Sequence, residues 1–340
     1  AGAVVLANDT HLLSTSTGNI TLQKTVNGAY DLRLQTAGTT EFDGLIGAIT
    51  PLHSLITDAS GQLRLNATLS GSDISVKTTQ AQTYLNAVVL AKDARLSSTT
   101  SGDITFDQTI NGAYALTVNT AGHTVFNGLI GNLTALSALT TDAGGVVHFN
   151  ATLSGSDVSV TTTGAQTYND DAVLMKSLQL SGGDVRFAKT VMGDSNASAR
   201  NVTITGTNVS FNDAIGSASG LIGALTINAS GETLFNGVVN VSSITTDAAG
   251  SVKFDISTVG SASVITTGTQ TYNDAVVLMH DTTLTSSGAL AAGNISLMRS
   301  VMGDSALTAD VRALTVNGTN VSFNGVVGGA SGLIGALSIN

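Results

Sequence analysis

The chain of 340 residues has no cysteine, no tryptophan and a single proline. Without cysteine there are no disulfides, thiolate metal sites or cysteine nucleophiles, and this suits a protein that must stay free of cross-links during export. Charged residues make up only 11% of the chain, which is about half the usual share. Hydrophobic residues reach 42%, however, so the sequence is not a disordered tract and is expected to fold.

The balance of charge is acidic, with a formal net charge of −10. The 13 lysines and arginines are scattered singly and cannot neutralise a run of phosphates, which excludes nucleic acid as a partner. No apolar run approaches the roughly 18 residues of a membrane helix, and AGAVVLANDT lacks the basic start of a signal peptide. Any targeting signal is therefore expected outside this segment.

One stretch of eleven residues occurs three times, as QAQTYLNAVVL, GAQTYNDDAVL and GTQTYNDAVVL. Its Gln-Thr-Tyr triplet starts at Gln82, Gln166 and Gln270, which gives long periods of 84 and 104 residues. A catalytic site is needed once, whereas a unit that buries its apolar face only against copies of itself must recur. We therefore predict one solenoid segment of a longer protein, with long repeats at about 1–84, 85–168, 169–272 and 273–340, the last incomplete.

A shorter period lies within each long repeat. Aromatic residues recur 18 to 26 residues apart, averaging near 21. Between them lie short segments, such as ALTVNT and VSVTTT, in which residues alternate as in a β-strand. This spacing predicts a parallel β-solenoid of about fifteen coils of ~21 residues, with four coils in the 84-residue repeat and five in the 104-residue repeat. Strand alternation places the aromatic residues inside, and it also places Gln82, Gln166 and Gln270 inside, which is a misfit for a polar side chain. The Asn or Asp that follows most aromatics is expected at a corner of the coil.

Several stretches carry a more specific resemblance: LTVNTAGHTVFNGLIG, LTTDAGG, VTTTGAQTYNDDAVL and GNISL. Together they resemble the repeat region of filamentous-haemagglutinin-like large exoproteins, which are bacterial surface and secreted adhesins built on right-handed parallel β-helices. The resemblance covers essentially the whole chain. It implies a right-handed solenoid that serves as an extracellular shaft, exported by a two-partner or autotransporter route, with a host-cell, neighbouring-cell or glycan surface as its partner.

Motifs that suggest ligands have simpler explanations. GGASGLIG (Gly328 to Gly335) lacks the GK[ST] ending of a phosphate loop and is expected to be a bend. The TDA and MGDS stretches lack the GGxGxD pattern of calcium-binding solenoids, so their aspartates are expected in turns. The five histidines are replaced in other repeats, for example His11 by Arg95 and His148 by Arg64, which favours solvated faces. We therefore predict no catalytic, cofactor-binding or metal-binding residues.

A polysaccharide-cleaving enzyme, either a lyase or a glycosidase, remains the alternative, because parallel β-helices also host such enzymes. Its candidate residues are nonrepeating charges, namely Asp184, Arg186, Lys189 and Arg200. Since the loops here repeat along with the strands and do not build one cleft, we favour a structural or adhesive protein without catalysis. The unpaired strand edges at the two ends of a solenoid make end-to-end assembly into fibres a second structural hypothesis.

Overall fold

The computed structural model describes residues 2–58, 60–257, 262–305, 311–330 and 332–340, and in these residues the fold is all-β. The one helical element among them is η1, a 3-10 turn at Leu290–Gly293. The chain forms two compact units, residues 1–172 and 173–340, and passes from one to the other within β21 (Asp171–Leu174). Short strands pair in parallel with strands one coil earlier and one coil later, so the predicted β-solenoid is confirmed, with about fourteen turns that lie about 23 residues apart.

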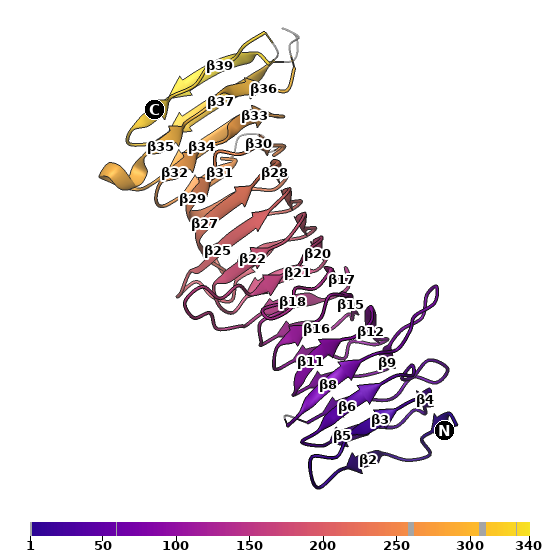
Figure 1. Ribbon diagram of the computed structural model, residues 1–340. Coiled ribbons are helices and arrows are strands. Elements are labelled where there is room, and N and C mark those ends of the chain that lie inside the picture. Colours follow the sequence, from indigo (N-terminus) through magenta and orange to yellow (C-terminus); the bar gives the residue numbers. More distant parts are fainter. Residues whose placement is uncertain (1, 59, 258–261, 306–310, 331) are drawn as a thin grey trace. The chain divides into compact units, whose positions relative to one another are not determined.

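The amino-terminal unit has three parallel sheets among its described residues (Figure 1, indigo to magenta). Sheet 1 contains β1 (Val4–Val5) and β4 (Val26–Asn27), and continues through a bridge at Ile46 to β9 (Val76–Thr78), β12 (Ala94–Ser98), β15 (Ala115–Asn119), β17 (Ala138–Thr141) and β20 (Gln166–Tyr168). Sheet 2 contains β2 (Thr10–Leu13), β5 (Leu32–Gln35), β7 (Leu55–Thr57), β10 (Gln82–Tyr84), β13 (Ile104–Phe106), β16 (His123–Phe126) and β18 (Val146–Phe149). Sheet 3 contains β3 (Ile20–Leu22), β6 (Thr39–Phe42), β8 (Gln62–Leu65), β11 (Ala87–Leu90) and β14 (Ile110–Asn111), and continues through Ile130 to β19 (Val160–Thr161).

The carboxy-terminal unit repeats this plan (Figure 1, magenta to yellow). Sheet 4 contains β23 (Val185–Phe187), β26 (Val209–Phe211), β28 (Glu232–Phe235), β30 (Ser251–Phe254), β33 (Ala275–Leu278) and β36 (Val301–Gly303). Sheet 5 contains β22 (Leu178–Ser181), β25 (Arg200–Gly206), β27 (Ile222–Ala229), the second half of β29 (Val239–Thr246), β32 (Gln270–Tyr272), β35 (Ile295–Leu297) and β38 (Val321–Phe323). Sheet 6 runs from β24 (Val191–Gly193) through Ile215 and the first half of β29 to β31 (Val264–Thr266), β34 (Thr282–Ser286), β37 (Arg312–Asn317) and β39 (Ile334–Ile339).

The long repeat does not contain a whole number of coils. Among the described residues, one 84-residue repeat holds eleven strand positions, β1 to β10 and the bridge at Ile46, and three positions make one coil. The repeat is therefore three and two-thirds coils long and not the predicted four, which is why a coil takes about 23 residues and not 21. As a result, the Gln-Thr-Tyr triplet lies in sheet 2 as β10 but in sheet 1 as β20. The VSF triplet of the other unit shifts in the same way, from sheet 4 in β26 to sheet 5 in β38.

The aromatic residues of the periodic row point inward, as predicted, whereas Tyr30 and Tyr114 outside the row are each 38% exposed. Tyr84, Phe106, Phe126 and Phe149 are at most 3% exposed, and the rings of Phe106 and Phe126 stack with their centroids 5.5 Å apart. Phe149 instead meets Tyr168 edge to face, at an interplanar angle of 87°. The geometry changes because Phe149 lies in sheet 2 and Tyr168 in sheet 1, so their side chains enter the core from different directions. In the other unit Phe254 of sheet 4 meets Tyr272 of sheet 5 at 89° for the same reason.

The buried glutamine of the Gln-Thr-Tyr triplet is satisfied by its own neighbours. The Tyr84 hydroxyl donates to Gln82 Oε1 at 2.7 Å, and Gln82 Nε2 donates to Thr78 Oγ1 at 3.2 Å. Burial raises the pKa of the Tyr84 phenol far above its ordinary value, so the ring stays a neutral donor. The same trio forms at Thr162, Gln166 and Tyr168 and at Thr266, Gln270 and Tyr272. The misfit seen in the sequence is therefore a self-contained hydrogen-bonding unit, and this explains why the stretch recurs.

The residues that follow the aromatics form ladders at the corners, as predicted. Asn127 Nδ2 donates to Asp107 Oδ1 at 2.7 Å, and Asn150 Nδ2 donates to Asn127 Oδ1 at 2.9 Å. Asn66 Nδ2 donates in the same way to Asp43 Oδ1 at 2.7 Å. Each bond joins one coil to the next, so polar side chains outside the core also contribute to stacking.

Removing one ring from the inner row is expected to be costly. Phe126→Ala should lower the free energy of unfolding by about 3 to 5 kcal/mol, because it leaves a cavity between Phe106 and Phe149. His123→Ala on the same strand is the control, since the His123 side chain is 49% exposed and its removal should cost less than ~0.5 kcal/mol. Urea unfolding followed by circular dichroism measures both. An equal loss in the two variants would contradict the inward row.

Candidate functional site: a groove on sheet 2

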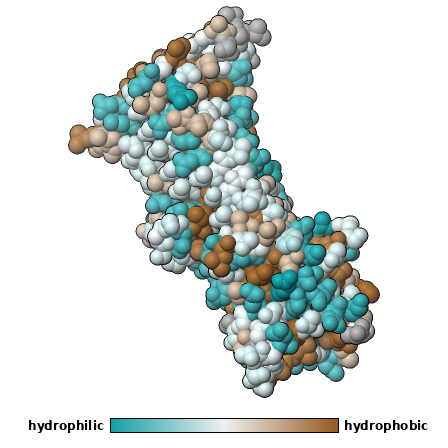
Figure 2. Space-filling model, viewed as in Figure 1, coloured by the Kyte–Doolittle hydropathy of each residue, from teal (hydrophilic) through white to brown (hydrophobic). Residues whose placement is uncertain are grey.

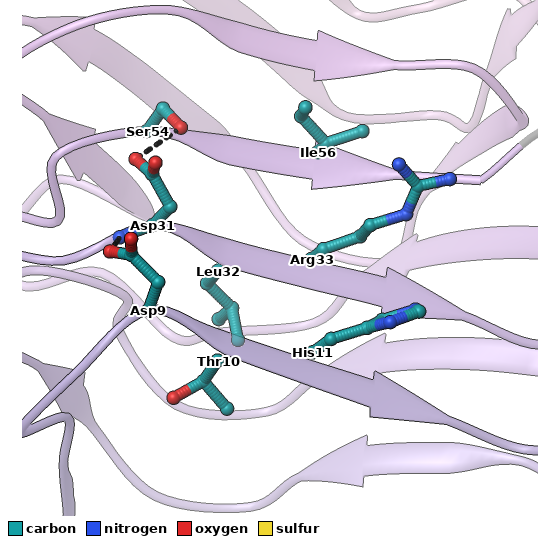
Figure 3. Close-up of a pocket in the computed structure, with 8 residues that line it drawn as sticks. All are labelled: Asp9, Thr10, His11, Asp31, Leu32, Arg33, Ser54 and Ile56. Carbon is teal, nitrogen blue, oxygen red and sulfur yellow. Dashed lines mark hydrogen bonds between the residues drawn. The ribbon is translucent and has the colours of Figure 1, made fainter.

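A groove of about 280 Å³ crosses the outer side of β2, β5 and β7 in the amino-terminal unit (Figure 3). Because parallel strands stack in register, side chains from three successive coils meet along it. The lining residues are Asp9, Thr10, His11, Asp31, Leu32, Arg33, Ser54 and Ile56. Sequence reasoning did not single out this groove, since its members are 22 to 23 residues apart and belong to no motif.

Two aspartates form one wall of the groove, on the left in Figure 3. Asp9 Oδ1 accepts the Asp31 backbone N–H at 3.0 Å, and Asp31 Oδ1 accepts the Ser54 hydroxyl at 2.7 Å. Asp31 Oδ1 also lies 2.7 Å from His53 Nδ1. The hydrogen bonds from Ser54 and His53 hold the pKa of the Asp31 carboxyl below its ordinary value, so this wall carries negative charge at neutral pH.

Two basic side chains form the opposite wall. His11, Arg33 and Ile56 are in register on adjacent strands, so they follow one another along the solenoid. The His11 ring lies 3.2 Å from Gln35 Oε1 through its Nε2 atom. The Arg33 side chain has no hydrogen bond or ion pair to another residue in the part of the chain that the structure describes. The groove therefore separates carboxylates on one side from an uncompensated guanidinium on the other.

Four of the five histidines lie on the surface of sheet 2, where they are exposed or half-buried, as the replacements between repeats predicted. His11, His53, His123 and His148 all lie on or beside strands of sheet 2. Their counterparts in other repeats lie elsewhere, because the long repeat shifts each motif to a different sheet. Arg95, the counterpart of His11, is in β12 of sheet 1, and Arg64, the counterpart of His148, is in β8 of sheet 3. Replacement between repeats therefore says nothing about whether the surface of sheet 2 is important.

Two of these histidines stack directly. The rings of His123 and His148 lie 4.7 Å apart, and His123 Nδ1 is 3.2 Å from Asp103 Oδ1. Burial lowers the pKa of His148, and the neighbouring His123 lowers it further. Among the described residues, no group of three or more His, Asp or Glu side chains is arranged to hold a metal ion.

The four candidate residues of the enzymatic alternative lie on two different sheets. Asp184 Oδ1 accepts the backbone N–H and the side-chain amide of Asn208, at 3.2 and 2.9 Å. Arg186 projects outward from β23 of sheet 4, and Lys189 follows that strand. Arg200 begins β25 of sheet 5 and makes a two-point ion pair with Asp194, at 2.8 and 2.9 Å. The structure thus gives these charges separate roles and does not bring the four together.

The aspartates considered for calcium bind the protein's own backbone and side chains. The TDA aspartates, Asp58, Asp142 and Asp247, accept backbone N–H groups of Thr36, Thr120 and Ala229 from the preceding coil, at 3.3, 3.0 and 3.1 Å. The MGDS aspartates, Asp194 and Asp304, pair with Arg200 and Arg312, and these arginines hold the pKa of both carboxyls below the ordinary value. Each of these carboxylates therefore forms a hydrogen bond or an ion pair within the protein.

The outer side of sheet 5 is largely uncharged. Its central outward row consists of one amide and six hydroxyl side chains in register, namely Gln179, Thr203, Thr226, Thr245, Thr271, Ser296 and Ser322. The visible face of the carboxy-terminal unit in Figure 2 is accordingly pale over β25, β27 and β29. This surface offers hydrogen bonds without charge, in contrast to the charged groove of sheet 2.

Two carboxyls, those of Asp170 and Asp274, are each only 1% exposed, unlike these surface groups. Asp274 follows Tyr272 at a corner. Burial raises its pKa to about 6, although the Thr246 hydroxyl offsets part of this effect. Asn86 takes the same place after Tyr84, where its Oδ1 accepts the Thr57 hydroxyl at 2.7 Å. An amide is thus accepted at this corner, where the Nδ2 group of Asn86 is buried without a hydrogen-bond partner among the described residues.

Asp274 should make the carboxy-terminal unit less stable as the pH rises. The folded-state pKa of about 6 exceeds the unfolded value of ~3.9, so the folded chain binds more protons between these values and loses stability as the pH increases through them. Asp274→Asn should therefore raise the free energy of unfolding by about 2 kcal/mol at pH 8 and change it little at pH 4. Urea unfolding at both pH values tests this, with the exposed Asp213→Asn as control. Parallel pH profiles for Asp274→Asn and the native chain would refute it.

Comparison with known proteins leaves the site to be interpreted from its own geometry. No family model, curated protein or solved structure matches the chain. In the described part of the chain, no helix has the length and apolar character needed to cross a membrane. The functional interpretation therefore depends on the arrangement of the side chains.

Proposed function

We propose that this chain is a segment of an extracellular adhesive or structural shaft, without catalysis. The observation that supports this most is the use of the recurring residues. The triplet that defines the long repeat is 0% exposed at both Gln82 and Tyr84, and the residues it contacts are also part of the repeat. The recurring residues are therefore those that make contacts inside the solenoid. A protein that gains length by adding coils needs such contacts in every coil.

The physical properties of the coils suit a shaft. Each added coil lengthens a solenoid by about 4.8 Å and buries its apolar side against the coil before it. Like charges stacked one above another would repel, and the low share of charged residues, 11%, limits this cost. Where charges do occur in neighbouring coils they often alternate in sign, as in the pair of Lys253 with Glu232 at 2.6 Å.

The proposed partners are surfaces and not small substrates. The outer sides of the sheets differ in charge and chemistry, from the charged groove of sheet 2 to the hydroxyl row of sheet 5. A host-cell, neighbouring-cell or glycan surface fits this variety better than one enclosed cleft would. The resemblance to secreted adhesins points the same way, and end-to-end assembly of chains into a fibre belongs to the same proposal.

The location of the segment can be tested on the cells that produce the parent protein. An antibody against residues 173–340 should label intact cells along surface filaments, and brief external protease treatment should remove the label. A cytoplasmic protein serves as the control for cell integrity. Labelling that appears only after lysis would contradict an extracellular shaft.

The absence of catalysis can be tested with purified protein. Incubation with a panel of neutral and acidic polysaccharides should release no new reducing or unsaturated ends, because the charged candidates are spread over sheets 4 and 5. Asp184→Asn and Arg186→Gln serve as comparison variants. Release of ends by the native chain that either substitution abolishes would establish the enzymatic alternative instead.

A further inference from the structure

The polar atoms of the sheet 2 groove that have no partner within the described part of the protein indicate which chemical groups a ligand must have. On the acidic wall, the side-chain hydrogen bonds of Asp9 and Asp31 to other residues run through Oδ1 in both cases. The Asp31 carboxyl also receives the Ser54 backbone N–H. No side chain of the described residues donates to either Oδ2 atom, and a carboxylate oxygen has two lone pairs, so each Oδ2 can accept a hydrogen bond from a ligand. Because both carboxylates are fixed by these bonds to the next coil, the two acceptors form an ordered pair one coil apart.

The basic wall offers the opposite chemistry. The Arg33 guanidinium has five N–H donors in a planar fork that matches a carboxylate, and no other described residue bonds to it. Arginines on neighbouring sheets are engaged: Arg64 pairs with Glu41 at 2.9 Å, and Arg95 donates to the Gly71 carbonyl at 2.6 Å. Arg64, Arg200 and Arg312 pair with carboxylates, whereas the Arg33 guanidinium is left for a ligand.

Ile56 supplies an apolar surface next to these polar groups. It follows Arg33 in the outward row, one coil further along, and lines the same groove. A ligand that satisfies the whole groove therefore needs hydroxyl donors on one edge, a negative charge on the other and an aliphatic face between them. An acidic peptide has the charge but lacks the row of hydroxyl donors, and its further carboxylates would be repelled by Asp9 and Asp31.

We propose that the sheet 2 groove binds an acidic saccharide. The carboxylate of a uronic acid pairs with Arg33, the ring hydroxyls donate to Oδ2 of Asp9 and Asp31, and the aliphatic side of the ring packs on Ile56 (Figure 3). The proposal deepens the adhesive part of the proposed function and rests on it. A shaft that lacks this ligand would still be a shaft, so the cell-labelling test above and the binding test below can fail separately.

The chain contains an internal comparison for this site. The counterparts of Asp31, Arg33 and Ser54 in the next long repeat are Ala115, Thr117 and Ala138. They lie on or next to strands of sheet 1, and they keep neither the second carboxylate nor the guanidinium. The second repeat does have Asp93 and Arg95 as the counterparts of Asp9 and His11, but Arg95 is bonded to the Gly71 carbonyl. The pair of carboxylates beside an unbonded guanidinium therefore occurs once in these two repeats. Arg33→Thr copies the residue that the fold already accepts at the equivalent strand position.

Binding can be measured with a galacturonic acid trisaccharide as the probe. Titration of the full chain, followed by NMR or calorimetry at low salt, should show saturable binding, and Arg33→Thr should weaken it at least tenfold. Arg95→Thr is the matched control, because it removes the same charge from sheet 1, and it should bind as the native chain does. The methyl-esterified trisaccharide, which has the same shape without the charge, should bind at least tenfold more weakly than the acid.

The outcomes separate the proposal from its rivals. No saturable binding of the trisaccharide at millimolar concentration overturns it, and so does equal binding by the native chain and Arg33→Thr. Equal weakening by Arg33→Thr and Arg95→Thr would indicate general attraction of charge and also overturn the site. Tighter binding of a triglutamate peptide than of the trisaccharide would assign the groove to an acidic protein segment. Unchanged circular dichroism spectra verify that both variants are folded.

Discussion

The parallel hydrogen bonding between successive coils governs the rest of the structure. It places each residue directly against its counterpart one coil away, as Phe106 lies against Phe126 and Phe126 against Phe149. Each side chain must therefore pack against the side chain at the equivalent position of the next coil, about 23 residues later. Apolar rings meet this condition by stacking inside, and amides such as Asn127 and Asn150 meet it by hydrogen bonding outside.

The buried trio of Thr, Gln and Tyr differs from both of these arrangements, because it places polar groups inside the core. A polar group in the core needs a partner, and here the partners come from the same short stretch of chain. Since most of its bonds are internal, the trio does not depend on which sheet it enters. This is why the same stretch is accepted in sheet 2 at Tyr84 and in sheet 1 at Tyr168, although the ring next to it stacks in one case and is edge-on in the other.

Much of the fold could be predicted from the sequence, because alternation is local. The inward position of Phe126 and the corner position of Asn127 follow from two-residue periodicity and turn chemistry. The number of coils could not be predicted as well. One strand position in each repeat is reduced to a single bridging residue, Ile46 or Ile130, and a single residue shows no alternating pattern in the sequence. The groove was missed because the alignment of His11, Arg33 and Ile56 depends on where the chain turns within two successive coils, and local alternation does not determine those turns.

The fractional coil count gives duplication an unusual effect in this protein. Copying an ordinary repeat adds another identical surface in line with the first. Here a copied segment keeps its interior contacts but presents its exterior in a new direction, as the histidines of sheet 2 and their counterparts on sheets 1 and 3 show. An outward residue of one copy can therefore change without affecting the surface on which its counterpart in the other copy lies. A gene that grew by duplication for the sake of length would acquire, without further cost to folding, independent surfaces on which new specificities can arise.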